Sequence, residues 1–179
     1  MTPDQRAAGP GLLNPGPEVR RLVPPQLTRA HASRLAGCYE HASYEITGPD
    51  GETEWQARGL GVPGSVDPVD RWLASVHCAS AVVLTACQPF SSGVSEEEDG
   101  RRHSTLGLLV AASGLRWRRA RSSDPAGLWP VEPGFALLDC PAGWVPGLLE
   151  AWSQWAVLWL DGHGARFQWH AAWPSRLRP

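Results

Sequence analysis

The sequence predicts an α+β protein with a single mixed, largely antiparallel sheet and helices packed on one face. Two observations support this fold class. Segments typical of strands outnumber those typical of helices, and from residue 79 onward their order is β-α-β-β-α-β-β, after an N-terminal strand and helix. In addition, Asp161-Gly162 between two such segments is a strong hairpin signal. The 179 residues, 42% of them hydrophobic, suffice for one core.

The N-terminal part combines a Pro/Gly-rich segment with a few short elements. Residues 1–26 contain six Pro and three Gly, which predicts a mobile tail there and one α+β domain over 27–179. A helix over 27–38 and a strand over 39–47 follow, and the strand ends at a Gly-Pro-Asp-Gly turn. Asp67-Pro68 predicts the start of a further helix, with the Asp67 side chain as its N-cap.

The later elements have clearer patterns. The apolar run 79–87 is typical of a buried central strand, which Gln88-Pro89 ends. Ser95 and Glu98 form a capping box that opens a helix, and Gly114 is a plausible end for it. The remaining elements are predicted as two strands, a helix and two strands: 115–121, 135–140, a helix from Pro141, 155–160 and 165–170.

Composition excludes several function classes. All 16 basic residues are Arg, so chemistry that needs a Lys side chain, such as Schiff-base formation, is excluded. The net charge of −2 gives no global attraction to nucleic acid or anionic lipid. No apolar run approaches the roughly 18 residues of a membrane span, so we expect a cytoplasmic protein without membrane contact.

We expect neither a metal nor a cofactor. The four Cys residues form no C-x-x-C pair and are interpreted as buried free thiols, and His77 beside Cys78 lacks further ligands at suitable spacing. The stretch 59–64 matches G-x-G-x-x-G, but it contains Pro63 and the next predicted helix starts only at Asp67-Pro68.

Five short motifs, in this order along the chain, resemble a bacterial family of unknown function, domain-of-unknown-function family 3293. The motifs are Leu84–Pro89, Asp99–Leu106, Asp124-Pro125 with Gly127, Trp129-Pro130 with Glu132, and Gln154–Trp159, and the resemblance covers roughly residues 80–162. It implies no known reaction.

The sequence departs from the family pattern at four positions. The resemblance implies Trp or Asn at these places, where this chain has Cys87, Gln88, Asp99 and Trp155. A member of the family that has lost its function is therefore one alternative.

The polar residues of these motifs form the candidate site. Residues that follow the central strand and open the two later connections are predicted to bind a ligand: Thr85, Gln88, Trp129, Glu132 and Gln154. The catalytic candidates are His103, Asp99 and Glu132, because a carboxylate one helical turn from a His can orient the imidazole, raise its pKa and make it a general base. The alternative is that these side chains are solvated on a helix face or cap loops.

We therefore expect a domain that binds a small polar ligand, for example a nucleotide-like one, in a pocket at the end of the central strand. The sequence leaves open whether the protein is an enzyme and what its oligomeric state is.

Two other functions remain alternatives. The Arg-rich strand 116–121 could bind nucleic acid through Arg116, Trp117, Arg118, Arg119 and Arg121. Alternation along a strand disperses these charges, which instead favours an exposed strand that guards a sheet edge or pairs with the acidic run 96–99. An interaction module could use Trp residues exposed near the C-terminus, namely Trp155, Trp159, Trp169 and Trp173.

Overall fold

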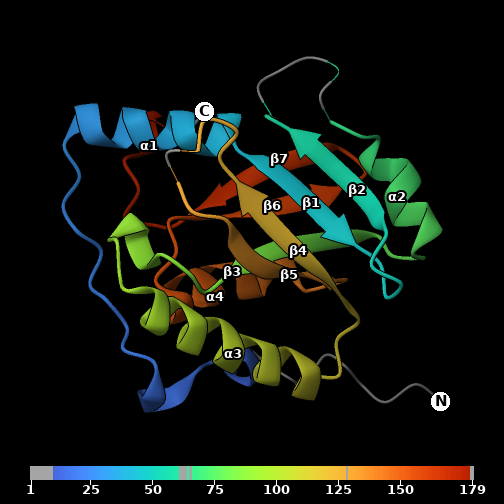
Figure 1. Cartoon of the computed structure of the whole chain (residues 1–179), viewed down its shortest axis with the longest axis horizontal. Coiled ribbons are helices and arrows are strands. Elements are labelled where there is room, and N and C mark those ends of the chain that lie inside the picture. The colour runs from blue at the N-terminus through green and yellow to red at the C-terminus, as the bar shows by residue number, and fades with distance from the viewer. Residues whose placement is uncertain (1–9, 61–63, 65, 128, 178–179) are drawn as a thin grey trace.

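The computed structural model describes residues 10–60, 64, 66–127 and 129–177, and these residues form an α+β fold (Figure 1). Its sheet has seven strands in the order β2-β1-β4-β5-β3-β6-β7. The strands are β1 Ser43–Thr47, β2 Thr53–Arg58, β3 Ser80–Thr85, β4 Trp117–Ser123, β5 Glu132–Leu138, β6 Ala156–Asp161 and β7 Gly164–Trp169. The helices are α1 Arg29–His41, α2 Val69–Ser75, α3 Glu96–Ala112 and α4 Val145–Trp152.

The predicted fold class is confirmed, and from β3 onward the order of its elements is the predicted one, whereas β2 is an additional strand. A further detail differs, because every strand pair in the described sheet is antiparallel and the sheet is not mixed. The reason is topological. α3 joins β3 to β4 with β5 inserted between them, and α4 joins β5 to β6 with β3 inserted between them. This connectivity is that of the split β-α-β motif.

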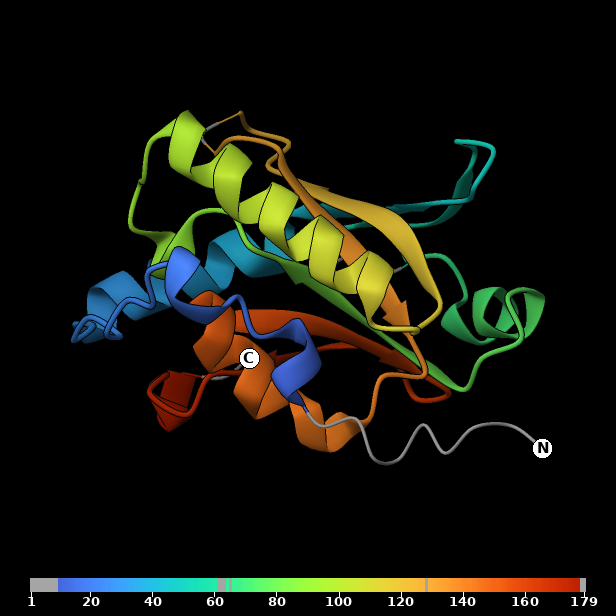
Figure 2. The same ribbon diagram turned by 90° about the horizontal axis from the view of Figure 1, so that it is seen from below.

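The sheet curls strongly into a half-barrel, and helices cover both of its faces. α3 and α4 pack on the convex face (Figure 2). Leu84, Leu106, Leu148 and Trp152 are fully buried there. α3 and α4 thus share one face, as predicted, whereas α2 lies on the other. The concave face is covered separately by α2, which contacts the edge strands β2 and β7 as well as β6. Strong curling brings those two edges within reach of one short helix.

The N-terminal segment differs from the predicted tail. Leu13 and Val19 are buried in the convex-face core, and the Trp152 indole donates to the Leu13 carbonyl oxygen at 2.9 Å. The backbone N–H of Leu22 donates to Ser153 Oγ at 2.9 Å. Residues 10–22 therefore pack against the convex-face helices, whereas residues 1–9 of the expected tail lie outside the described residues.

A buried aromatic cluster lies where α1 meets the C-terminal segment. Trp155 and Trp173 are fully buried there beside Phe90, with ring centroids of the two Trp residues 5.5 Å apart. Trp159 is buried in the convex-face core, and Trp169 is half-buried. The alternative of an interaction surface built on these exposed Trp residues is therefore wrong at three of its four positions, because packing against helices and loops covers them.

The helix starts were predicted with mixed success. Ser95 caps α3 by accepting a hydrogen bond from the Glu98 N–H, as the capping-box motif predicts. The predicted N-cap role of Asp67 is wrong: α2 begins after Pro68 without a side-chain cap, and Asp67 Oδ2 instead accepts from the Gln56 N–H of β2 at 3.1 Å.

Candidate functional site

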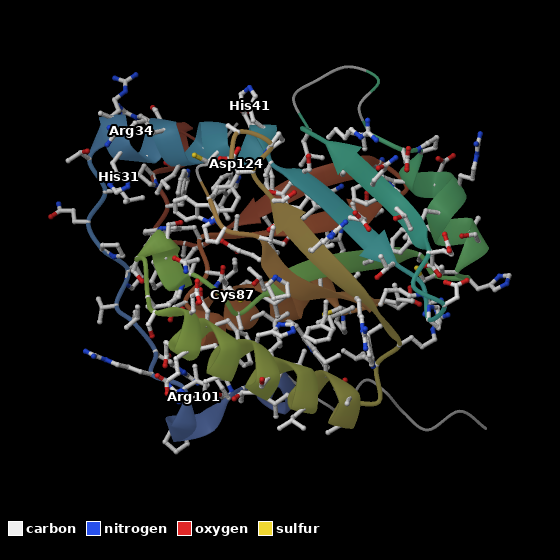
Figure 3. The ribbon with its side chains drawn as sticks, in the orientation of Figure 1. His31, Arg34, His41, Cys87, Arg101 and Asp124 are labelled. Carbon is white, nitrogen blue, oxygen red and sulfur yellow. The ribbon has the colours of Figure 1, made fainter. Side chains whose placement is uncertain are left out.

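A cavity of about 90 Å³ lies in the concave face, at the end of the sheet covered by α1. Its wall combines α1, residues of six strands and the segments that follow β3 and β4. Figure 3 shows Asp124, after β4, beside α1, and Cys87, after β3, nearer to α3. The polar residues of its wall are Thr85, Gln88, Ser91, Arg121, Ser122, Ser123, Asp124, Glu132 and Gln154, and its aromatic residues are Tyr39, Tyr44, Trp129 and Phe167.

Strand alternation explains why these side chains meet. Tyr44 of β1 pairs with Ser122 of β4, which pairs with Glu132 of β5, so the three residues form one row across the sheet. Directly paired residues project to the same face of a sheet. The next row contains Thr85 of β3 opposite Gly134 of β5. This face is concave, so curvature brings the rows together.

Gly134 allows the strands to approach closely at the cavity. A Cβ atom at this position would lie 2.5 Å from the backbone carbonyl oxygen of Leu84. Real Cβ atoms do not tolerate that distance, so the wall of the cavity requires Gly here.

Glu132 contributes a half-buried carboxyl group to the cavity. Burial raises its pKa from 4.5 to about 7, the Trp129 indole opposes this rise, and the negative charge of Asp99 adds to it. Trp129 Nε1 donates to Glu132 Oε1 at 2.6 Å. Glu132 is therefore partly protonated near neutral pH, a state suited to proton exchange with a bound molecule.

Gln88 and Asp99 form a tight pair across the turn after β3. Gln88 has a left-handed backbone with φ of 44°, and its N–H donates to Asp99 Oδ1 at 2.7 Å. The Gln88 side-chain amide donates to the second carboxylate oxygen, Asp99 Oδ2. Gln88 and Asp99, two of the positions where the resemblance implies Asn, thus complement each other directly.

Gln154 and Thr85 are held by the backbone around them. Gln154 is buried, and its Nε2 donates to the carbonyl oxygens of Cys87 at 2.9 Å and Trp152 at 3.3 Å. Thr85 Oγ1 donates to the Pro133 carbonyl oxygen at 2.9 Å and accepts from the Cys87 N–H at 3.0 Å. Thr85 therefore orders the turn after β3, and its hydroxyl is already engaged on both sides.

Backbone strain gathers beside the cavity. Positive φ angles at non-Gly residues occur in the segment after β3, at Gln88, Phe90 and Ser91, and in the segment before β6, at Ser153. Each costs free energy that the surrounding structure must offset. Phe90 N–H donates to the Ser153 carbonyl oxygen, which ties the two strained segments together.

The predicted pairing of Asp99 with His103 is wrong. Asp99 binds Gln88, and the His103 ring instead stacks on Phe135, with centroids 5.2 Å apart and planes 8° apart. Burial lowers the pKa of His103, the opposite of the predicted rise, and its buried Nδ1 has no hydrogen-bond partner among the described residues. His103 is also absent from the cavity wall, so of the three catalytic candidates only Glu132 lines the cavity.

The Arg-rich strand lies inside the sheet and not at its edge, because β4 runs between β1 and β5. Three of its Arg residues bind carboxylates, none of them in the acidic run 96–99. Arg116 pairs with Asp139 at 2.9 Å, Arg118 with Glu54 at 3.0 Å and Arg121 with Glu45 at 2.6 Å. Trp117 is half-buried against Phe135. Nucleic-acid binding by this strand stays a prediction, and these pairs reduce the charge available for it.

Sequence analysis missed the aromatic part of the wall and a buried cation behind it. Tyr44 alternates with Ile46 along β1, a pattern that could have placed it on the inner face. Arg102 is 1% exposed and donates to the carbonyl oxygens of Ala86 at 2.7 Å and Trp152 at 2.6 Å. Its position one turn before Leu106 on the apolar stripe of α3 was the available signal.

The described residues contain no group of three or more His, Cys, Asp or Glu side chains that could hold a metal ion. Cys87 and Cys140 are buried free thiols as expected, but Cys78 is half-buried and Cys38 is exposed. No helix in this part of the chain has the length and apolarity to cross a membrane.

The fold and cavity together define an α+β half-barrel protein with a cavity in its concave face that is lined by both polar and apolar residues. Residues 84–157 match the model of a family described as a protein of unknown function, DUF3293, which confirms the resemblance. The matched segment includes Gln88, Glu132 and Gln154. No curated protein and no solved structure matches the chain.

Proposed function

We propose that the protein binds a small polar ligand in the cavity at the end of β3. One observation carries the proposal: Gln88, Glu132 and Gln154 come from three separate parts of the chain and line the same cavity. A polar group turned away from water is costly unless it has partners, and several such groups around an open cavity are typical of ligand sites.

Two features of the wall support the proposal. The first is the perturbed carboxyl group of Glu132, because strongly shifted pKa values gather at functional sites. The second is the strained backbone at Gln88 and Ser91, which both line the cavity. Neither feature identifies a reaction, so the proposal concerns binding.

Thermal unfolding in the presence of small polar metabolites, nucleotides included, tests the proposal. A ligand at about 100 times its Kd stabilises the folded state by about 2.7 kcal/mol, which raises Tm by roughly 5–10 °C for a chain of this size. The double variant Gln88→Ala with Glu132→Ala should remain folded and lose that rise.

The control replaces the same residue types on the surface. Gln26 and Glu97 are exposed, so Gln26→Ala with Glu97→Ala should keep the full rise in Tm. The proposal is refuted if no compound raises Tm, or if the cavity double variant responds like the wild-type protein.

A further inference from the structure

Three of the four side-chain amide N–H donors of Gln88 and Gln154 already have partners in the protein. Gln88 Nε2 donates to the Asp99 carboxylate, and Gln154 Nε2 donates to the carbonyl oxygens of Cys87 and Trp152. Because these partners are acceptors, they fix the orientation of both amides. The Oε1 atoms of Gln88 and Gln154 accept no hydrogen bond from the described residues and remain as acceptors.

Glu132 adds a third acceptor. Its Oε1 atom receives the Trp129 indole N–H, whereas its Oε2 atom has no donor among the described residues. The Trp129 indole N–H therefore already has a partner as well. The fixed side chains of the wall therefore present acceptor oxygens from three connections, and a complementary ligand must supply the donors.

The charges of the wall also favour a positively charged ligand. Arg121 is the one basic residue among the described residues of the wall, and its Nε and Nη2 atoms both bind Glu45 Oε2, at 3.1 and 2.6 Å. The negative groups of the wall are Asp124 and Glu132. No unpaired cation of the wall is therefore placed to receive a phosphate, which argues against the nucleotide-like ligand.

Aromatic rings in the wall add to the preference for a cation. Tyr39, Tyr44 and Phe167 form one corner of the wall, with Tyr39 and Phe167 centroids 5.6 Å apart and Tyr44 and Phe167 centroids 6.0 Å apart. The faces of aromatic rings attract cations, an attraction that strengthens away from water.

We propose that the cavity selects a small organic cation with N–H donors, such as a primary ammonium, held by Gln88, Glu132 and Gln154. This inference rests on the proposed function and specifies its ligand class. The cavity volume of about 90 Å³ fits an ammonium head with a short chain. Each N–H of the ammonium would reach one acceptor oxygen, and the charge would face the Glu132 carboxylate.

The proposal predicts a pH dependence with a definite sign. A bound cation favours the ionised form of Glu132, so binding releases a proton and becomes tighter as pH rises. With a pKa of about 7, the ionised fraction of Glu132 rises about tenfold between pH 6 and pH 8. An alkylamine stays protonated across this range. The titratable and charged groups that face Glu132 or share its cavity are Cys38, Tyr39, Tyr44, Cys87, Asp99, Arg121 and Asp124.

A matched set of probes tests the ligand class. The full chain is titrated with n-butylammonium, n-butanol and butyrate, and Kd is measured from NMR chemical shifts. We expect n-butylammonium to bind at least tenfold more tightly than the other two at pH 8. Its Kd should fall about tenfold from pH 6 to pH 8. Glu132→Gln should abolish this pH dependence, and Glu97→Gln on the exposed surface of α3 should retain it.

The outcomes separate this inference from the proposed function. If n-butanol or butyrate binds as tightly as n-butylammonium, the cation preference is overturned, while a metabolite-induced rise in Tm would still uphold ligand binding. If Glu132→Gln keeps the pH dependence of the wild-type protein, the role of Glu132 is overturned. If neither these probes nor the metabolites bind, both proposals fail. Circular dichroism of each variant verifies that it is folded.

Discussion

Replacement of Glu132 by Gln tests the physical state of the cavity without any ligand. Burial raises the pKa of Glu132 to about 7, against 4.5 for an ordinary Glu. Between these values the folded protein holds more protons than the unfolded chain. The free energy of unfolding therefore falls as pH rises through this window, and the loss from this group is complete above about pH 8.

The magnitude follows from the two pKa values. Their difference, about 7 minus 4.5, corresponds to about 3 kcal/mol of stability lost between pH 4 and pH 8. Gln keeps an acceptor for the Trp129 indole and has no charge to desolvate. The stability of Glu132→Gln relative to the wild-type protein should therefore increase by about 3 kcal/mol across this range.

Urea unfolding at pH 4, 6 and 8, followed by Trp fluorescence, measures this difference. Glu97→Gln, which removes an exposed carboxyl group from α3, is the matched control. The reasoning is refuted if the free energies of unfolding of the wild-type protein and of Glu132→Gln change in parallel with pH. Glu132 would then titrate alike in the folded and unfolded states.

Three further predictions concern the scaffold and the nucleic-acid alternative. Gly134→Ala should destabilise the protein by about 3 kcal/mol in urea, because its Cβ would lie 2.5 Å from a backbone oxygen of β3. Gly100→Ala, in open space on α3, should stabilise it by about 0.5–1 kcal/mol, and equal effects would contradict the packing argument. Arg102→Met should cost about 3 kcal/mol by orphaning buried carbonyl groups, and an unchanged urea midpoint would exclude this role. Arg118→Ala with Arg119→Ala should leave affinity for single-stranded DNA unchanged, whereas loss of a salt-sensitive affinity would favour nucleic-acid binding.

Local chemistry made much of the fold predictable. The Ser95 cap, the apolar run of β3 and the hairpin at Asp161-Gly162 each depend on residues close together in sequence. The order of strands does not. Whether β3 and β4 pair directly or admit β5 between them depends on long-range packing, and that choice made the sheet antiparallel.

The candidate site was predictable to the same extent. Gln88, Glu132 and Gln154 stand at ends of strands, where side chains of neighbouring strands gather, and all three line the cavity. The pairing of Asp99 with Gln88 could not be predicted from the position of Asp99 on α3. Its spacing to His103 is suitable, but the turn at Gln88 brings another donor to the same carboxylate.

The hydrogen bond between Trp129 and Glu132 gives this protein an internal spectroscopic reporter. The Trp129 indole is hydrogen-bonded to a carboxyl group that changes charge near neutral pH. The NMR resonance of this indole should therefore shift when the charge changes. Fluorine-labelled Trp would therefore follow the protonation of the cavity directly, in intact cells as well as in solution, before any ligand has been identified.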